Sequence, residues 1–474
     1  MTIEKYNDVM ARKNEIMKKA VGIDYDRFRT EGIAFDYEQM MQEAGYSIEE
    51  IIKIQMSTSV GNTPLIELKN IGNLVRRISP KGKGARIFLK DEACNPSGSF
   101  KDRRASVSVF HAHKHGFPGV VAATSGNYGA AVASQAAKYN LKCMILQETF
   151  DSKGVGQPEI LEKGRSCEAL GAEVVQMTVG PELFYYFLVC LEETGFFNAS
   201  LYTPFGISGI ETLGMEIATE MKLRENRYPD VVLVTHAGGG NLTGTARGLR
   251  KAHADGTRVI GASVDLHGLH MASDVDFNRK SFTTGHTGFG IPFAVFPDRS
   301  DVPLNAARPL RYMDDYYLVT QGEVFYTTEM LAQLEGLQRG PAGNTSLCAA
   351  IGLARKMEKN QIIVVQETEY TSAGKCPSAQ LSFALDHGIR VDCGDPSMDE
   401  PGNRIVIPER TEQIAPKKVD LTKLRASYVN QMVKSTGRVD FSHEEIRFMA
   451  EDIRCHSDEI KRLIQSIKNG LNDQ

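Results

Sequence analysis

The chain contains 474 residues, of which 42% are hydrophobic and 24% are charged, and its 55 Lys and Arg against 59 Asp and Glu give a formal net charge of −4. These values are typical of a globular protein with room for roughly two to four domains. The near-neutral balance, with no block of basic residues, excludes a chain that coats nucleic acid or an anionic membrane. Small molecules or other proteins are therefore the expected partners.

The cysteines and the N-terminus indicate the compartment. The eight cysteines are scattered along the chain without a CxxC pair, so we expect reduced thiols and neither a disulfide framework nor a zinc site. The N-terminal residues mix acids and bases without an apolar core and do not resemble a secretory signal. No apolar run approaches the roughly 18 residues that span a bilayer. These features predict a cytoplasmic protein without a membrane segment.

The pattern of apolar and charged residues changes twice along the chain. Residues 1–58 predict an N-terminal extension of charged amphipathic helices, with Ser47 as an N-cap. From 59 to 410, short β-branched runs such as ARIFLKD alternate with Ala-rich helical stretches, which is typical of parallel βαβ units in an open α/β sheet. Residues 411–474 predict a helical C-terminal tail, in which Ser442 is the N-cap of one helix. This tail either packs on the main domain or contacts another subunit.

A lysine follows a turn at the start of one predicted helix. Lys101 stands after Asn95-Pro96-Ser97-Gly98-Ser99-Phe100 and begins the helical stretch KDRRASVSVFHAHKHG. The positive end of a helix dipole disfavours the charged form of a lysine and leaves more of the neutral, nucleophilic amine. Lys101 is therefore a candidate for an imine-forming lysine, although many first-turn lysines are only surface residues.

A second polar segment, 124–129 (TSGNYG), lies between a strand-like run and an Ala-rich helix. Hydroxyls, an amide and backbone N–H groups at a helix start form an anion site that suits a carboxylate. Helix caps use the same residue types, so the pattern by itself is only moderately specific.

A third segment, 238–244 (GGGNLTG), follows the strand-like run DVVLVTHA. Consecutive glycines let backbone amides surround a phosphate, and the next helix adds its dipole. A Walker loop needs Gly-Lys-Ser/Thr after its spacer, and a dinucleotide fingerprint needs glycine where Thr243 stands. The segment therefore predicts a phosphate site of neither nucleotide type.

An imine-forming lysine, a carboxylate loop and a phosphate loop together suit pyridoxal phosphate, which carries an aldehyde and a phosphate. In this order the segments closely resemble the fold-type II pyridoxal-phosphate enzymes, the family of threonine and cysteine synthases. Residues 61–65 (GNTPL) are similar to that family's opening motif and 99–103 (SFKDR) to its lysine motif. The resemblance covers roughly residues 59–385. It implies an α/β fold like that of tryptophan synthase β, in which two open, mostly parallel sheets are flanked by helices and a smaller domain at about 88–205 is inserted in the larger one.

The resemblance also implies roles for individual residues. Lys101 would hold pyridoxal phosphate and later move protons, and Asn127 would bond the hydroxyl of the cofactor ring. The substrate carboxylate would be held by Thr124, Ser125 and Gly126, and the phosphate by Gly238, Gly239, Gly240, Asn241 and Leu242.

The resemblance does not single out one partner for the nitrogen of the cofactor ring. In the family a Ser or Thr at the end of a late strand has this role, and the corresponding stretch here, 366–372 (QETEYTS), contains several candidates. Thr368 is the first choice, with Thr371 and Glu367 as alternatives. A neutral hydroxyl would leave the ring nitrogen unprotonated, whereas Glu367 would protonate it, so the choice matters for the chemistry.

The chain differs from the amino-acid synthases in several features. In these features it resembles a narrower family, the β subunits of 2-amino-4-oxopentanoate thiolases of anaerobic ornithine fermentation. The features include the helical N-terminal extension, the insert at 180–214 and the stretch at 281–303. The implied reaction is (2R)-2-amino-4-oxopentanoate with CoA giving acetyl-CoA and D-alanine. The resemblance implies an internal aldimine on Lys101, then an external aldimine with the substrate that frees Lys101, a ketimine and an enamine. The alternative is a β-replacement or elimination enzyme such as a threonine, cysteine or cysteate synthase relative.

The narrower resemblance also suggests partners and one more site residue. It implies a small α subunit, and homodimerisation of the β subunit is usual for the fold. His286, in a Gly-rich loop, is a candidate substrate-binding residue that activates the thiol or polarises the ketone, unless it is only a turn residue. His111, His113 and His115 alternate along a probable helix and point in different directions, so no metal site is expected.

Overall fold

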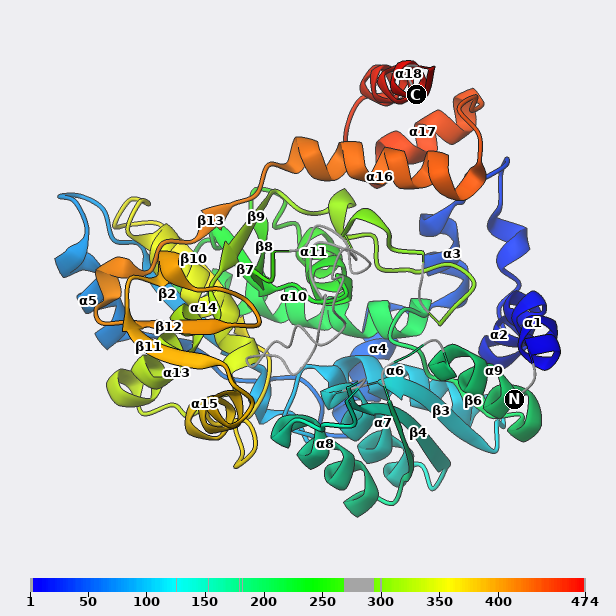
Figure 1. Ribbon diagram of the computed structural model, residues 1–474, viewed down its shortest axis with the longest axis horizontal. Coiled ribbons are helices and arrows are strands. Elements are labelled where there is room, and N and C mark those ends of the chain that lie inside the picture. Colours follow the sequence, from blue (N-terminus) through cyan, green and yellow to red (C-terminus); the bar gives the residue numbers. More distant parts are fainter. Residues whose placement is uncertain are drawn as a thin grey trace.

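The computed structural model describes residues 3–124, 126–151, 153–178, 180, 182–267, 294–298 and 301–472. Two sheets organise the chain, each with helices on its faces, and the terminal helices pack around them (Figure 1). This arrangement confirms the predicted α/β class with two open, mostly parallel sheets and helical extensions at both ends.

The larger sheet has seven strands within the described residues. Its five central strands run parallel, and a short antiparallel strand closes each edge. In sheet order the strands are β1 (Leu65–Glu67), β2 (Arg86–Asp91), β10 (Ile362–Glu367), β7 (Val231–Thr235), β8 (Arg258–Val264), β9 (Asp315–Val319) and β13 (Lys417–Lys418). The expectation that strands stop near residue 410 is therefore wrong for β13, because two exposed lysines carry no apolar signal.

Helices cover both faces of this sheet. α10 (Pro204–Glu225) and α11 (Gly240–Lys251) pack on one face, and α5 (Lys69–Ile78), α13 (Gln321–Glu335) and α14 (Pro341–Ala354) pack on the other. Along β10, Ile362 and Val364 belong to the α10/α11 core, whereas Ile363 and Val365 belong to the α14 core. Even-numbered side chains of β10 thus point toward α11, as the alternation of a strand requires.

The smaller sheet is formed by four parallel strands of the described chain, in the order β5 (Glu173–Thr178), β4 (Lys142–Phe150), β3 (Gly119–Thr124) and β6 (Phe197–Asn198). Its helices are α6 (Lys101–Lys114), α7 (Asn127–Lys138), α8 (Pro158–Ala169) and α9 (Glu182–Thr194). These elements lie inside the predicted range 88–205, but the limit at residue 88 falls within β2, a strand of the larger sheet.

A two-stranded parallel unit, β11 (Arg390–Gly394) with β12 (Arg404–Pro408), follows α15 (Pro377–Asp386). Val406 and Ile405 of β12 lie beside α13, where the backbone of Gly322 meets the carbonyl of Val406. This unit therefore extends the larger body beyond its seven-stranded sheet.

The N-terminal helices are α1 (Ile3–Ala11), α2 (Lys13–Val21), α3 (Tyr37–Ala44) and α4 (Ile48–Ser57). Ser47 caps α4 in a complete capping box with Glu50, as predicted for this residue. Apolar residues of α1 and α2 share a core with α9 and the smaller sheet, at the blue end of Figure 1. Their apolar faces are thus covered within this chain.

The C-terminal helices α16 (Leu421–Thr436), α17 (His443–Asp452) and α18 (Ser457–Asn472) lie across one edge of the molecule (Figure 1). The buried Arg308 guanidinium donates to Asp452 of α17 at 2.8 Å and lies 4.7 Å from the ring of Tyr37 in α3. Tyr428 of α16 donates to the same carboxylate at 2.6 Å. Both terminal extensions are therefore joined to the body at one buried ionic contact.

Among the described residues, no helix combines the length and apolar composition needed to cross a bilayer.

Candidate active site

The loop that carries Lys101 is closed by local hydrogen bonds. Lys101 is the first residue of α6, and the carboxylate of the next residue, Asp102, reaches back over the turn. The Asp102 carboxylate accepts hydrogen bonds from the backbone N–H of Ser97 at 2.7 Å and from the Ser97 hydroxyl at 2.6 Å. It also accepts one from the side chain of Gln135 of α7 at 3.2 Å. The turn before the lysine is therefore held to both α6 and α7.

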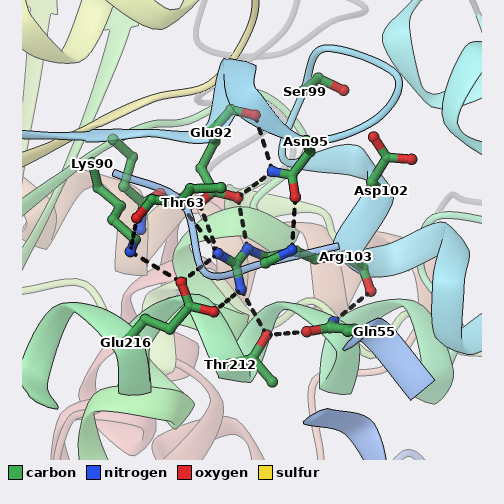
Figure 2. Close-up of polar contacts among 12 residues, drawn as sticks. Gln55, Thr63, Lys90, Glu92, Asn95, Ser99, Asp102, Arg103, Thr212 and Glu216 are labelled. Carbon is green, nitrogen blue, oxygen red and sulfur yellow. Dashed lines mark hydrogen bonds and ion pairs between the residues drawn. The ribbon is translucent and has the colours of Figure 1, made fainter. Parts of the chain in front are cut away.

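A buried ionic network holds the base of the same loop (Figure 2). Arg103 donates to Glu92 at 2.6 and 2.8 Å and to Glu216 at 2.8 and 2.7 Å. Glu92 also accepts from Thr63 at 2.6 Å and from Asn95 at 2.9 Å. The opening motif 61–65 thus anchors the lysine loop through Arg103.

The surroundings of the Lys101 amine favour its neutral form. Burial, the positive charge of Arg104 and that of Lys163 hold the pKa of Lys101 well below its ordinary value, and only Glu369 opposes this shift. Its Nζ lies 4.7 Å from the centre of the Phe100 ring. A neutral amine is the form that attacks an aldehyde and that accepts a proton.

The segment after β10 runs directly beside the lysine loop. The Phe100 N–H donates to the Thr368 carbonyl at 3.2 Å, and the Tyr370 N–H donates to the Gly98 carbonyl at 2.8 Å. The structure therefore brings Thr368 to Lys101, although more than two hundred residues separate them in the sequence.

The three candidates for the ring nitrogen lie in different surroundings. Gln366 donates to Thr245 of α11 at 2.8 Å, and buried Thr368 directly follows the end of β10. The buried carboxyl of Glu367 instead lies against Gly343 of α14, and in the part of the chain that the structure describes neither of its side-chain oxygens has a hydrogen-bond partner. Burial and the nearby Glu369 and Asp91 raise the pKa of Glu367 well above its ordinary value. Thr371 is only partly buried.

Asn127, at the start of α7, belongs to a buried ionic cluster. Its side-chain oxygen accepts from Lys375 at 2.7 Å, and its amide donates to Glu369. Lys375 and Glu369 form an ion pair at 2.9 Å, and Glu159 and Lys163 of α8 form another. Burial by itself raises the pKa of Glu369, but Lys375 and Lys163 outweigh it and hold that pKa below its ordinary value.

The carboxylate loop is described only in part. Thr124 ends β3, and its hydroxyl accepts a hydrogen bond from the Gly126 N–H at 3.0 Å. Gly126 directly precedes α7, so its neighbourhood carries the positive end of that helix dipole. Ser125 and His286 lie outside the described residues.

The glycine run joins β7 to α11 and is closely surrounded. Gly239 has a φ of 81°, and a Cβ there would lie 2.7 Å from Pro309. A Cβ at Gly238 would overlap the Tyr202 hydroxyl, and one at Gly240 would overlap the Arg104 guanidinium. Gly239 has a backbone conformation that favours glycine, and a larger residue at Gly238 or Gly240 would require the neighbouring side chain to move. A run of small residues before a helix suits a bound anion. Asn241 and Leu242 follow as buried residues of the first turn.

Several polar residues at this site escaped the sequence prediction. Arg104 follows Lys101 by three residues, so helical spacing was a usable signal. His236, two residues before the glycine run, is buried with Nε2 unpartnered, and burial lowers its pKa to about 4. Lys375 and Glu369 carried no signal, because folding alone brings them to α7.

These features fit pyridoxal phosphate. A partly buried lysine with a lowered pKa suits its aldehyde, and a glycine cradle beside a buried guanidinium, whose Nε has no partner among the described residues, suits its phosphate. The Asn127 amide has a second hydrogen beyond the one given to Glu369, which suits a ring hydroxyl. Both ends of the cofactor thus find groups of matching chemistry.

Comparison with known proteins agrees with this site. Residues 56–369 match the family model described as pyridoxal-phosphate dependent enzyme. The chain belongs to this family of pyridoxal-phosphate-dependent enzymes, which confirms the predicted cofactor.

Two relatives are similar over nearly their whole length. One, from an unknown prokaryotic organism, is named 2-amino-4-ketopentanoate thiolase beta subunit and is 62% identical over 98% of both chains. Another of the same name, from Acetoanaerobium sticklandii, is 60% identical over 98% of both chains. Among solved structures, a pyridoxal 5'-phosphate-dependent aspartate racemase has a TM-score of 0.55 at 17% identity, covering 70% of this chain and 97% of its own. That last likeness concerns the fold.

Proposed function

We propose that this chain is the pyridoxal-phosphate subunit of a thiolase that cleaves (2R)-2-amino-4-oxopentanoate with CoA into acetyl-CoA and D-alanine. The observation that carries the proposal is the 62% identity over 98% of both chains with a relative named for this substrate, there called 2-amino-4-ketopentanoate. A match from end to end includes the N-terminal extension and the inserts that distinguish this chain from amino-acid synthases.

The reaction balances without an oxidant or reductant. The sulfur of CoA bonds to the ketone carbon Cγ, the Cβ–Cγ bond breaks, and the thiol hydrogen replaces the acetyl group on alanine. When bound, pyridoxal phosphate supplies an electron sink for the charge that develops on the amino-acid part.

In this proposal the residues of the chain bind the reactants and move protons. Thr124 and Gly126, at the start of α7, hold the substrate carboxylate, since that helix end favours an anion. Thr368 faces the ring nitrogen as a neutral hydroxyl, because Glu367 points to the opposite face of β10. Lys101 takes the proton from Cα and returns protons to the alanine part, which its lowered pKa allows near neutral pH.

The same proposal includes partners and location. A subunit named beta in the relatives points to an α subunit here, and we propose a homodimer of this chain within that assembly. CoA is the second substrate. Cytoplasmic ornithine degradation is the proposed setting.

The decisive test combines the full-length chain, loaded with pyridoxal phosphate, with the small subunit, 2-amino-4-oxopentanoate and CoA. Acetyl-CoA and alanine should form in equal amounts from the 2R enantiomer, and Lys101→Ala should abolish them without loss of folding. If acetyl-CoA does not form while O-acetylserine or O-phosphohomoserine is consumed, the chain is a β-replacement enzyme and the proposal is wrong. Activity restricted to the 2S enantiomer would contradict only the stereochemistry.

A further inference from the structure

Arg104 is a buried cation without a carboxylate partner among the described residues. Its side chain is 2% exposed, and its single hydrogen bond there is from Nη1 to the Leu201 carbonyl at 3.2 Å. The buried Nε has no partner. Burial lowers the pKa of this guanidinium to about 10, so it still carries its charge at neutral pH.

Other deeply buried guanidinium groups of this chain are compensated. Arg103 is paired with Glu92 and Glu216, and Arg308 with Asp298 and Asp452. An uncompensated charge inside a protein is strongly unfavourable. Within the described residues Arg104 is thus the exception, and its surroundings suit a bound anion.

The position of Arg104 identifies which anion that is. Its Nη2 occupies the space beside Gly240, the first residue of α11, where a Cβ would stand. Two kinds of positive potential therefore meet at this point, the guanidinium charge and the N-terminal dipole of α11. The hydroxyl of Tyr202 lies at the same loop, against Gly238.

We propose that the Arg104 guanidinium is a direct ligand of the cofactor phosphate, so that α6 supplies both the lysine for the aldehyde and a cation for the phosphate. The two residues are three apart on one helix and thus share a face. The proposal rests on the cofactor and is independent of the thiolase reaction.

A phosphate-free analogue isolates this contact. Arg104→Met keeps much of the side-chain length and removes the charge, and affinities of the full-length apo-protein for pyridoxal phosphate and for pyridoxal are measured by absorbance, without CoA. Hydrogen bonds to charged groups are strong enough that pyridoxal phosphate should bind about tenfold or more weakly. Binding of pyridoxal should stay within about twofold, and Arg104→Lys should recover part of the lost affinity.

A second measurement does not depend on a variant. Phosphorus NMR of the wild-type holoenzyme follows the ionisation of the bound phosphate, whose second pKa is about 6 when free. Contact with a guanidinium should keep it a dianion well below that pH. A bound phosphate that takes up its proton near pH 6 overturns the proposal even if Arg104→Met fails to fold.

The control is Arg165→Met, which removes an exposed arginine of α8 and should alter neither affinity. Equal losses for pyridoxal phosphate and pyridoxal in Arg104→Met would show that the residue is only structural. Unchanged cofactor binding together with a raised KM for CoA would assign the guanidinium to the phosphates of CoA. Either result overturns the proposal.

Discussion

Glu216 provides a quantitative test of the network that anchors the lysine loop. Its carboxylate accepts from Arg103 at 2.7 and 2.8 Å and from the Asn62 N–H at 2.9 Å, and it lies 3.0 Å from the amine of Lys90 (Figure 2). Arg103 and Lys90 are fully buried. Glu216→Gln keeps the shape of the side chain and removes the carboxylate charge that these two cations share; Glu92 and Glu220 remain beside them.

The expected loss follows from the pKa of Glu216. Burial by itself would raise that pKa, but Arg103 and Lys90 outweigh burial and hold it at about 2. An unfolded glutamate has a pKa of about 4.3, so the shift corresponds to a stabilisation of about 3 kcal/mol at neutral pH. Because the folded pKa is depressed, this stabilisation is complete above about pH 4.3 and is lost as the pH falls toward 2.

The assay is urea denaturation of wild type and Glu216→Gln, followed by far-ultraviolet circular dichroism between pH 7 and pH 3. The variant should be about 3 kcal/mol less stable at pH 7, and the difference should shrink as the pH falls below 5. Glu15→Gln is the control, because Glu15 pairs with Lys19 at 2.8 Å between two exposed side chains. The stability of this variant should not differ measurably from wild type. A difference that is small at pH 7, or constant with pH, would refute the reasoning.

Three further outcomes are expected. Lys375→Met leaves Glu369 buried without its 2.9 Å partner and should lower the free energy of unfolding by on the order of 3 kcal/mol. Adding Glu369→Gln should restore part of the lost stability. A double variant no more stable than the single one would count against the ion pair. Gly240→Ala should weaken pyridoxal phosphate binding about tenfold or more, because the added methyl group overlaps the neighbouring guanidinium. The control Gly256→Ala, whose Cβ would meet nothing, should bind the cofactor as wild type does. Equal affinities of the two variants would contradict the expected role of Gly240. The rate at which the apo-protein attaches pyridoxal phosphate, measured by stopped-flow absorbance, should rise with pH as Lys101 loses its proton. Because the pKa of Lys101 is lowered, the rate should level off well before pH 10.5. A rate that continues to rise up to pH 10.5 would exclude the lowered pKa.

Long-range pairing adds information on questions that the sequence left open. The stretch 366–372 contains three candidates for the ring nitrogen, and residue type does not rank them. The fold shows the surroundings of one of them, because Glu367 lies against Gly343 of α14, on the face of β10 opposite to Gln366, which donates to Thr245 of α11. The role of 61–65 is similar, since only the folded chain shows that Thr63 contacts Glu92 beside Arg103.

The sequence by itself determined the fold class, the cofactor and the order of the site segments. These depend on local chemistry: a lysine at a helix start, hydroxyls and glycine before another helix, and a glycine run after a buried strand. The tertiary structure decided which charges surround those segments. The glycine run predicted a phosphate site built from backbone amides and a helix dipole, and the fold adds that α6 places Arg104 at Gly240 and that Lys375 and Glu369 lie at Asn127. Such contacts join residues far apart in the chain, and electrostatic interactions depend on their distance and burial in space.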